Sequence, residues 1–260
     1  MMLVKLDFFS PFVSKPAFLE HGAGPLLPPP TTLLGALGAV AVRPEERFYA
    51  PRADFVLFWA PPYTEGVGLY RHYTFMTQKP GRLKKLPKAI EMVLKGREDK
   101  VVESGMTARD LIQNFLGVGS RREVYFWDSA YLLVSGGEAE KLAPYVYRVG
   151  QKEGLVAATP LKFTAEDLGA REVETRFYIP ADWASECTAV PYYGQVTAQC
   201  REEYFFDPRL GLNAERQPFY VPPPMGYIRV RPAKGYTAVK IVPEVEKELY
   251  ALLPKEYARS

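Results

Sequence analysis

The sequence predicts an α+β protein with an N-terminal part of mixed strands and helices and a smaller, mainly β C-terminal part. Apolar segments up to about residue 162 follow the order strand, helix, strand, strand, helix, strand once residues 66–127 are set aside. Beyond them, short strands alternate with proline turns. The chain holds 24 prolines among 260 residues, which agrees with many turns and edge strands.

The first strand and the first helix flank a proline-rich loop. Apolar and polar side chains alternate over Leu3–Phe9, which is the pattern of a strand. An apolar run at about Thr32–Val42 predicts a buried helix, with Thr31 or Thr32 as its N-cap. The free N–H groups of its first turn predict a phosphate site. The alternative is a capped core helix that follows a proline loop.

The remaining N-terminal elements complete the order. Asp54–Ala60 is nearly continuous in apolar residues and predicts a strand buried on both faces. Ala130–Val134 predicts a short buried strand, Glu138–Tyr147 a helix, and the chain from Leu155 a further strand. This order is that of the ferredoxin-like, split βαβ arrangement.

Residues 66–127 differ in character from the segments on either side. Leu69–Phe75 and Arg122–Trp127 alternate like half-exposed strands, so we interpret the segment as an inserted arm whose flanking strands pair. The basic stretch Lys79–Lys88 places positive charge at the tip of the arm.

Two short helices are expected within the arm. Pro87 can be the first residue of a helix that ends before Gly96. The side chains expected to face inward on this helix are Ile90, Val93 and Leu94. Thr107-Ala108-Arg109-Asp110 resembles a capping box, with Asp in place of Glu, that opens a second helix to Leu116.

Beyond residue 163 we expect strands, proline turns and one final helix. The strands are expected at Glu172–Ile179, Tyr192–Gln199, Tyr227–Arg231 and Tyr236–Val242. Pro243 is expected to open an amphipathic last helix with Val245, Leu249, Leu252 and Leu253 on one face. The chain then divides into domains 1–162, with its insertion, and 163–260.

Composition bounds the class of protein. The net charge of +3 is only mildly basic, so any RNA surface must be local. No window reaches 18 uncharged apolar residues and the first residues lack a signal peptide's order, so we expect a cytoplasmic protein without a membrane span. Cys187 and Cys200 could join across a hairpin, but two reduced, part-buried thiols are expected.

Two short motifs occur in the order and in the topological places expected of a known family. They are Pro29-Pro30-Thr31-Thr32-Leu33-Leu34-Gly35-Ala36-Leu37-Gly38 and Arg148-x-Gly150-x-Lys152-Glu153-x-Leu155-Val156. Residues 1–160 thereby resemble the Cas-five family of CRISPR-associated RAMP proteins, most readily its type I-A (archaeal Cascade) branch. The resemblance implies a ferredoxin-like (RRM-like) RAMP domain whose inserted arm acts as a thumb that reaches over RNA.

The resemblance also implies a function. Such a protein is a non-catalytic subunit of the Cascade effector complex, and it binds the 5′ handle of the CRISPR RNA (crRNA) in antiviral defence. It caps one end of the complex and contacts a Cas-seven backbone subunit and the large subunit.

Binding of the crRNA handle needs hydrogen-bond donors for the RNA phosphates and aromatic surfaces on which bases stack. The expected RNA-binding residues are Thr31, Thr32, Arg148 and Lys152, with Tyr70, Arg71, His72, Tyr73, Arg82, Lys84 and Lys85 from the thumb. The alternative is that these cations form a solvated surface and that the tyrosines pack.

Two other functions stay open. A metal-independent endoribonuclease would use the RNA 2′-hydroxyl with a general base and acid, for which only His21 and His72 are available among histidines. A protein-only scaffold could dock through Pro222–Pro224 and its aromatic surface. No zinc-spaced Cys/His cluster, P-loop or Gly-x-Ser-x-Gly elbow occurs, so we expect no metal and no cofactor.

Overall fold

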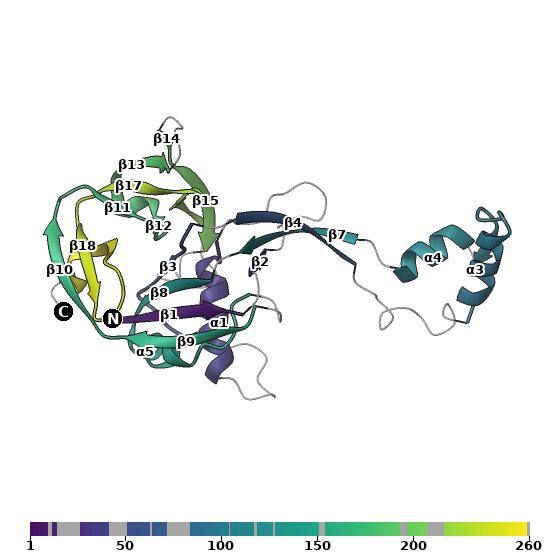
Figure 1. Ribbon diagram of the computed structural model, residues 1–260, viewed down its shortest axis with the longest axis horizontal. Coiled ribbons are helices and arrows are strands. Elements are labelled where there is room, and N and C mark those ends of the chain that lie inside the picture. The colour runs from purple at the N-terminus through teal and green to yellow at the C-terminus, as the bar shows by residue number, and fades with distance from the viewer. Residues whose placement is uncertain are drawn as a thin grey trace. The chain divides into compact units, whose positions relative to one another are not determined.

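The computed structural model shows an α+β protein divided into two compact units (Figure 1). The larger unit comprises Met1–Ala17, His21–Gly66 and Glu123–Ser260, and the smaller comprises Phe18–Glu20 and Val67–Arg122. The structure describes residues 1–9, 12–14, 27–41, 51–62, 64–71, 84–103, 105–116, 119–126, 128–150, 154–192, 197–206 and 216–258.

A four-stranded antiparallel sheet lies in the larger unit. Its strand order is β3-β8-β1-β9. The strands are β1 (Met2–Phe8), β3 (Phe55–Trp59), β8 (Ser129–Ser135) and β9 (Val156–Leu161). Helix α1 (Pro30–Ala41) joins β1 to β3, and α5 (Gly137–Leu142) with the 3-10 helix η1 (Ala143–Tyr145) joins β8 to β9. The two α-helices pack against each other.

Burial confirms the two central strands predicted from their apolar runs. All five residues of β3 are buried, and so are residues 130–135 of β8. The helix expected over Glu138–Tyr147 is shorter, because its α-helical part ends at Leu142. Pro144 follows, and a proline has no N–H to donate to the carbonyl of residue 140, so the chain tightens into η1.

Three further sheets build the rest of the larger unit, in the orders β10-β18-β19, β11-β17-β13-β14 and β12-β16-β15. Their strands are β10 (Phe163–Gly169), β11 (Val173–Thr175), β12 (Ile179–Pro180), β13 (Ala184–Pro191), β14 (Ala198–Gln199), β15 (Arg201–Phe206), β16 (Arg216–Val221), β17 (Gly226–Pro232), β18 (Tyr236–Pro243) and β19 (Leu249–Pro254). Short 3-10 helices occur at η2 (Ala181–Trp183) and η4 (Lys255–Tyr257).

The prediction that a final helix begins at Pro243 is wrong. Pro243 ends β18, and Leu249–Pro254 is a strand that pairs antiparallel with β18. Leu249, Leu252 and Leu253 are buried as expected, whereas Val245 lies 79% exposed in the connection between the strands. A short apolar run suits a buried strand as well as a buried helix, and pairing with β18 decided between them.

The hairpin at β13 and β14 corrects two more expectations. Tyr192–Gln199 is not one strand, because β13 ends at Pro191 and β14 begins at Ala198. The thiols of Cys187 and Cys200 are joined in a disulfide, so the prediction of reduced thiols is wrong. The pairing of Thr188 with Gln199 brings the two cysteines opposite each other, with Cα atoms 5.7 Å apart.

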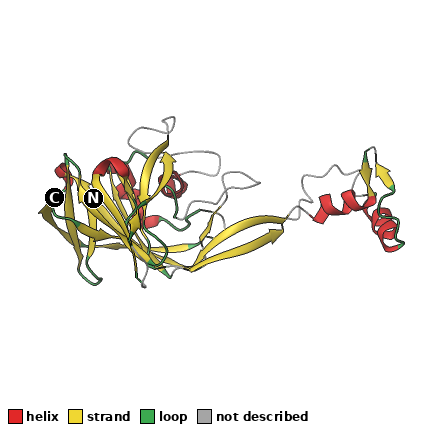
Figure 2. Ribbon diagram, turned by 90° about the horizontal axis from the view of Figure 1, so that it is seen from above, coloured by secondary structure: helices red, strands yellow, loops and turns green. Residues whose placement is uncertain are grey.

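The inserted segment begins and ends in one sheet. Strands β2 (Phe12–Ser14), β4 (Thr64–Arg71) and β7 (Gly119–Phe126) lie in the order β2-β7-β4, so the strands that flank the insertion are neighbours. The smaller unit also contains α3 (Leu86–Leu94), β5 (Val101–Glu103), β6 (Met106–Thr107) and α4 (Ala108–Leu116). Figure 2 shows these two helices beside their short hairpin.

The capping box predicted before α4 is confirmed. The carboxylate of Asp110 accepts the Thr107 backbone N–H at 3.0 Å, and the Thr107 hydroxyl accepts the Asp110 N–H at 3.1 Å. Helix α3 begins at Leu86, one residue before the predicted Pro87, and ends before Gly96 as predicted, but two of the three side chains expected to face inward do not. Ile90 and Leu94 are 43% and 81% exposed, because α3 instead turns Ala89 toward α4.

Candidate nucleic-acid interface

Exposed aromatic side chains gather where β1 ends. Phe9, directly after β1, is 74% exposed, and its N–H donates to the carbonyl of Leu155 at 3.1 Å. Tyr147 is 50% exposed, and its carbonyl accepts the N–H of Val156 at 2.9 Å. The backbones of Phe9 and Tyr147 thus flank the start of β9. We name Phe9, Tyr145, Tyr147, Arg148 and Leu155 the β1-end patch.

The local sequence explains why these side chains point outward. Buried residues at Ala143, Val146 and Val149 anchor the segment after α5 in the core. Tyr145 and Tyr147 fall between these anchors and are therefore exposed. The same alternation could have identified both tyrosines from the sequence, but our sequence reasoning missed them, as it missed Phe9.

A turn positions Arg148 beside these aromatic rings. Arg148 pairs with Leu155 in an isolated bridge, and the N–H of Val149 donates to the carbonyl of Gly154 at 2.8 Å. Gly150 has φ of 81°, a left-handed conformation that favours glycine. The Arg148 guanidinium lies 6.0 Å from the centre of the Tyr147 ring. The patch therefore combines a cation with aromatic faces on which bases can stack.

The face of the central sheet that carries Lys5 is occupied from within the protein. Lys5, Tyr131 and Trp59 lie in one row across β1, β8 and β3. Glu246, between β18 and β19, accepts from the Lys5 ammonium at 2.7 Å and from the Tyr131 hydroxyl at 3.0 Å. The ammonium of Lys247 lies 4.4 Å from the centre of the Trp59 ring. These contacts cover the row.

The pKa values of this cluster reflect its contacts. The hydrogen bond from Lys5 lowers the pKa of Glu246, and the same bond raises the pKa of Lys5. Burial, aided by the bond to Glu246, raises the pKa of Tyr131 to about 12. Burial also lowers the pKa of Lys247, and the nearby Arg176 lowers it further. Tyr131 and Glu246 are thus held as donor and acceptor at neutral pH.

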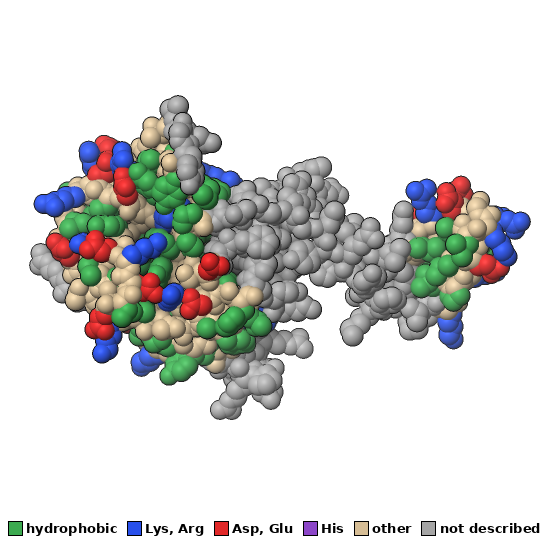
Figure 3. All heavy atoms as spheres, viewed as in Figure 1, with side chains coloured by type: hydrophobic (Ala, Val, Ile, Leu, Met, Phe, Trp, Pro, Cys, Tyr) green, Lys and Arg blue, Asp and Glu red, His purple; other side chains and the backbone are tan. Residues whose placement is uncertain are grey.

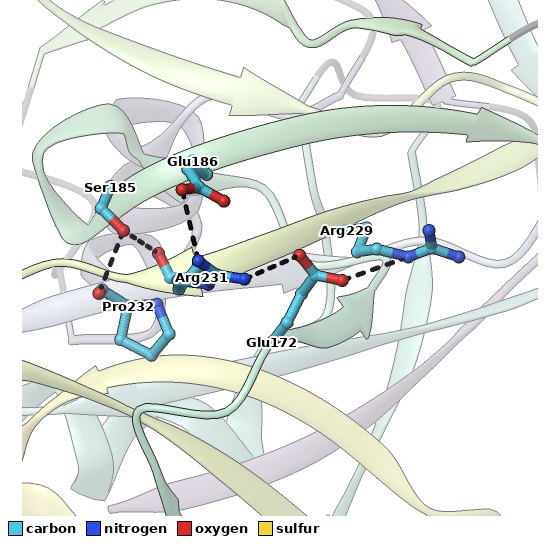
Figure 4. A network of polar contacts seen from close by, with 6 residues as sticks. All are labelled: Glu172, Ser185, Glu186, Arg229, Arg231 and Pro232. Carbon is cyan, nitrogen blue, oxygen red and sulfur yellow. Dashed lines mark hydrogen bonds and ion pairs between the residues drawn. The ribbon is translucent and has the colours of Figure 1, made fainter.

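The outer arginines of the sheet that contains β17 face carboxylates (Figure 4). Arg229 lies 2.9 Å from Glu174, and Arg231 lies 3.3 Å from Glu186. Glu172 lies between the two arginines, at 3.6 Å from Arg229 and 3.9 Å from Arg231. This surface neutralises its own charge and offers phosphates little attraction.

The N-cap predicted at Thr31 or Thr32 is corrected by the structure. Helix α1 begins at Pro30, so Thr31 and Thr32 lie inside the helix and neither is its N-cap. The N–H groups of Thr32 and Leu33 both donate to the carbonyl of Pro29, at 2.9 and 3.2 Å. The N–H of Thr32, expected to be free, therefore already has an acceptor.

The other predicted RNA-binding residues fall in three groups. Arg148 lies in the β1-end patch, and Lys84 and Lys85 precede α3, where Lys84 is exposed. Tyr70 and Arg71 belong to β4. Outside the described residues lie Lys152, His72, Tyr73, Arg82 and the alternative catalytic residue His21.

Comparisons with known proteins assign the chain to no family. No family model matches it, and no curated protein matches it. Among solved structures, it is similar to one titled "Crystal structure of a CRISPR protein from Archaeoglobus fulgidus". The two share 16% sequence identity over 97% of this chain and 98% of that chain, with a TM-score of 0.47.

The part of the chain that the structure describes offers neither a membrane-spanning helix nor a metal cluster. Within it, no helix has both the length and the apolar character needed to span a bilayer. The same residues include no group of three or more His, Cys, Asp or Glu side chains arranged to hold a metal ion.

Proposed function

We propose that this chain is a non-catalytic RNA-binding subunit of a type I CRISPR effector complex, of the Cas-five kind. It binds the 5′ handle of crRNA and caps one end of the complex, next to a Cas-seven backbone subunit and the large subunit. The observation that carries the RNA-binding role is the β1-end patch, in which Arg148 lies beside the exposed ring of Tyr147.

The order of the central elements supports a RAMP domain. The chain runs β1, α1, β3, β8, α5, β9, and the strands lie in the order β3-β8-β1-β9. A β-α-β-β-α-β chain in an antiparallel sheet is the arrangement of ferredoxin-like domains. The two motifs that resemble the Cas-five family fall at α1 and at the turn before β9, so the second motif contributes Arg148 to the patch.

The face of the central sheet that carries Lys5 and the β1-end patch differ in whether their aromatic side chains are accessible to RNA bases. Many RRM-type domains stack bases on aromatic residues of the sheet surface. Here Lys5 and Tyr131 of that surface are bound to Glu246. The patch at the end of the sheet keeps its aromatic rings exposed, so bases are expected to stack there.

The distribution of charge supports a contribution from the insertion. Val67–Arg122 contains 12 Lys and Arg residues and 5 Asp and Glu residues, a net charge of +7, while the whole chain carries only +3. The rest of the chain is therefore net negative, at −4. A local excess of positive charge attracts the RNA backbone and makes binding depend on salt.

Equilibrium binding of a labelled crRNA to the purified chain tests this function. Phe9→Ala and Tyr147→Ala should each weaken binding by roughly 5- to 150-fold, because base–aromatic stacking contributes about 1–3 kcal/mol per base. Arg148→Ala should make the slope of the logarithm of the association constant against the logarithm of the salt concentration less steep by about one. Tyr204→Ala is the matched control, since Tyr204 is 58% exposed on β15, apart from the patch.

Two outcomes would contradict the proposal. Equal affinities of the wild type, Phe9→Ala and Tyr147→Ala would show that the patch does not hold RNA. Discrete cleavage of precursor RNA in EDTA, abolished by His21→Ala or His72→Ala, would instead assign a metal-independent endoribonuclease.

A further inference from the structure

Helix α3 carries more apolar surface than its own unit buries. The side chains that face the core of the smaller unit are Leu86, Ala89, Met92 and Val93. At about 100° per residue, Ile90, Leu94 and Pro87 continue this arc around the helix. The apolar arc therefore covers roughly 220° of the circumference, more than one neighbouring helix can cover. Ile90 and Leu94 are 43% and 81% exposed.

The buried core of the smaller unit is slight. Among the described residues it consists of Ala89 on α3 and of Ala108 and Leu111 on α4. Units of this size bury a smaller share of their surface than larger domains do, and are marginally stable by themselves. In Figure 3 the hydrophobic side chains of this unit gather on the visible face, with Lys, Arg, Asp and Glu side chains along its border. We name Pro87, Ile90 and Leu94 the α3 stripe.

The chemistry of the α3 stripe selects the kind of partner. Ile90 and Leu94 are aliphatic and stand at i and i+4, the spacing by which an amphipathic helix fills an apolar groove of another protein. Nucleic acid needs aromatic faces for its bases and hydrogen-bond donors for its phosphates, and the stripe offers neither. Its occupant is therefore a protein.

Charge determines what surrounds the groove of that protein. On the side of α3 away from the core lie Lys88 and Lys95, and Lys95 is paired with Glu91. Residues 84–100, which contain α3, carry six Lys and Arg against three Asp and Glu, a net charge of +3, so a complementary surface bears carboxylates around its apolar groove.

We infer that the α3 stripe docks into an apolar, acid-rimmed groove of a neighbouring protein subunit of the effector complex. This inference rests on the proposed function for the identity of the complex. It assigns the tip of the insertion to protein contact, separately from the RNA contact of the β1-end patch.

The test measures binding of the full-length chain to the recombinant backbone subunit and to the recombinant large subunit, each alone. Leu94→Glu and Ile90→Glu should weaken binding to one of them at least tenfold, while crRNA affinity stays within twofold of the wild type. Val245→Glu is the matched control, because Val245 is 79% exposed in the larger unit, and it should bind like the wild type. Hydrogen exchange of the wild-type amides over Leu86–Leu94 should slow in the same complex.

Each other outcome would overturn the inference. The stripe is not a docking element if Leu94→Glu binds both subunits like the wild type, or if the wild type binds neither. If Leu94→Glu loses crRNA but keeps its protein partner, α3 is a nucleic-acid surface instead. A wild-type chain that fails to bind crRNA counts against the proposed function alone, because the protein-binding arms are measured without RNA.

Discussion

Replacing Arg176 by methionine should lower the free energy of unfolding of the larger unit by roughly 3–7 kcal/mol. Arg176 is only 4% exposed, and its Nε–H donates to the carbonyl of Ala60. Its Nη2 donates to the carbonyls of Pro61 and Pro224, at 2.8 and 3.2 Å, and its Nη1 donates to that of Pro223 at 3.4 Å. Methionine keeps the apolar stem but donates no hydrogen bond.

The magnitude follows from these carbonyls. The buried Ala60 carbonyl contributes about 1–3 kcal/mol when its donor is lost, and each of the three part-buried carbonyls about 0.5–1.5 kcal/mol. Ala60 and Pro61 follow β3 and precede β4, whereas Pro223 and Pro224 precede β17. Arg176 therefore joins the segment between β3 and β4 to the segment before β17.

Urea unfolding of the full chain at pH 7 measures the effect through the midpoint and slope. Arg231→Met is the matched control, because Arg231 has a side chain 49% exposed and makes surface ion pairs with Glu172 and Glu186. Such pairs contribute about 0–1 kcal/mol. If Arg176→Met lowers the free energy of unfolding no more than Arg231→Met does, the hydrogen bonds from the guanidinium to the four carbonyls do not stabilise the fold as argued.

Two other contacts give measurable predictions. Cys187→Ser with Cys200→Ser should lower the free energy of unfolding by about 3 kcal/mol, since the disulfide closes a loop between residues 13 apart. Urea midpoints of wild type and variant measure this, and equal midpoints would contradict it. Glu246→Gln should cost about 1–3 kcal/mol at pH 7. Because the Lys5 bond lowers the pKa of Glu246 from 4.5 and raises that of Lys5 from 10.5, the contribution is complete between these values and fades in acid and in strong base. An equal cost at pH 3 and pH 7 would refute this.

Local patterns were sufficient where neighbouring residues alone decide the structure. The spacing of Thr107 and Asp110 predicted the start of α4, because the two residues satisfy each other's backbone N–H groups. The unbroken apolar run of β3 predicted burial on both faces. Pro243 and the leucines after it predicted burial correctly but the wrong element, because only the pairing of β19 with β18 distinguishes a strand from a helix there.

The candidate site likewise depends on contacts that local sequence patterns do not predict. Arg148 was predicted from its motif, but Phe9 is distant from it in sequence, and the two flank Leu155 only because β1 and β9 pair antiparallel. The N-cap predicted at Thr31 or Thr32 was wrong because α1 begins at Pro30 and the carbonyl of Pro29 accepts the Thr32 N–H, a backbone geometry that residue types do not specify.

The sequence by itself determined the α+β class, the central order of strands and helices, the capping box of α4 and the concentration of positive charge in the insertion. These depend on periodicity, local hydrogen bonding and composition, which neighbouring residues share. Only the tertiary structure decided that Cys187 pairs with Cys200, that Lys5 and Tyr131 are held by Glu246, and that Ile90 and Leu94 face outward. Each of these depends on which surface another element covers, and such contacts form between residues that the chain brings together only when it folds.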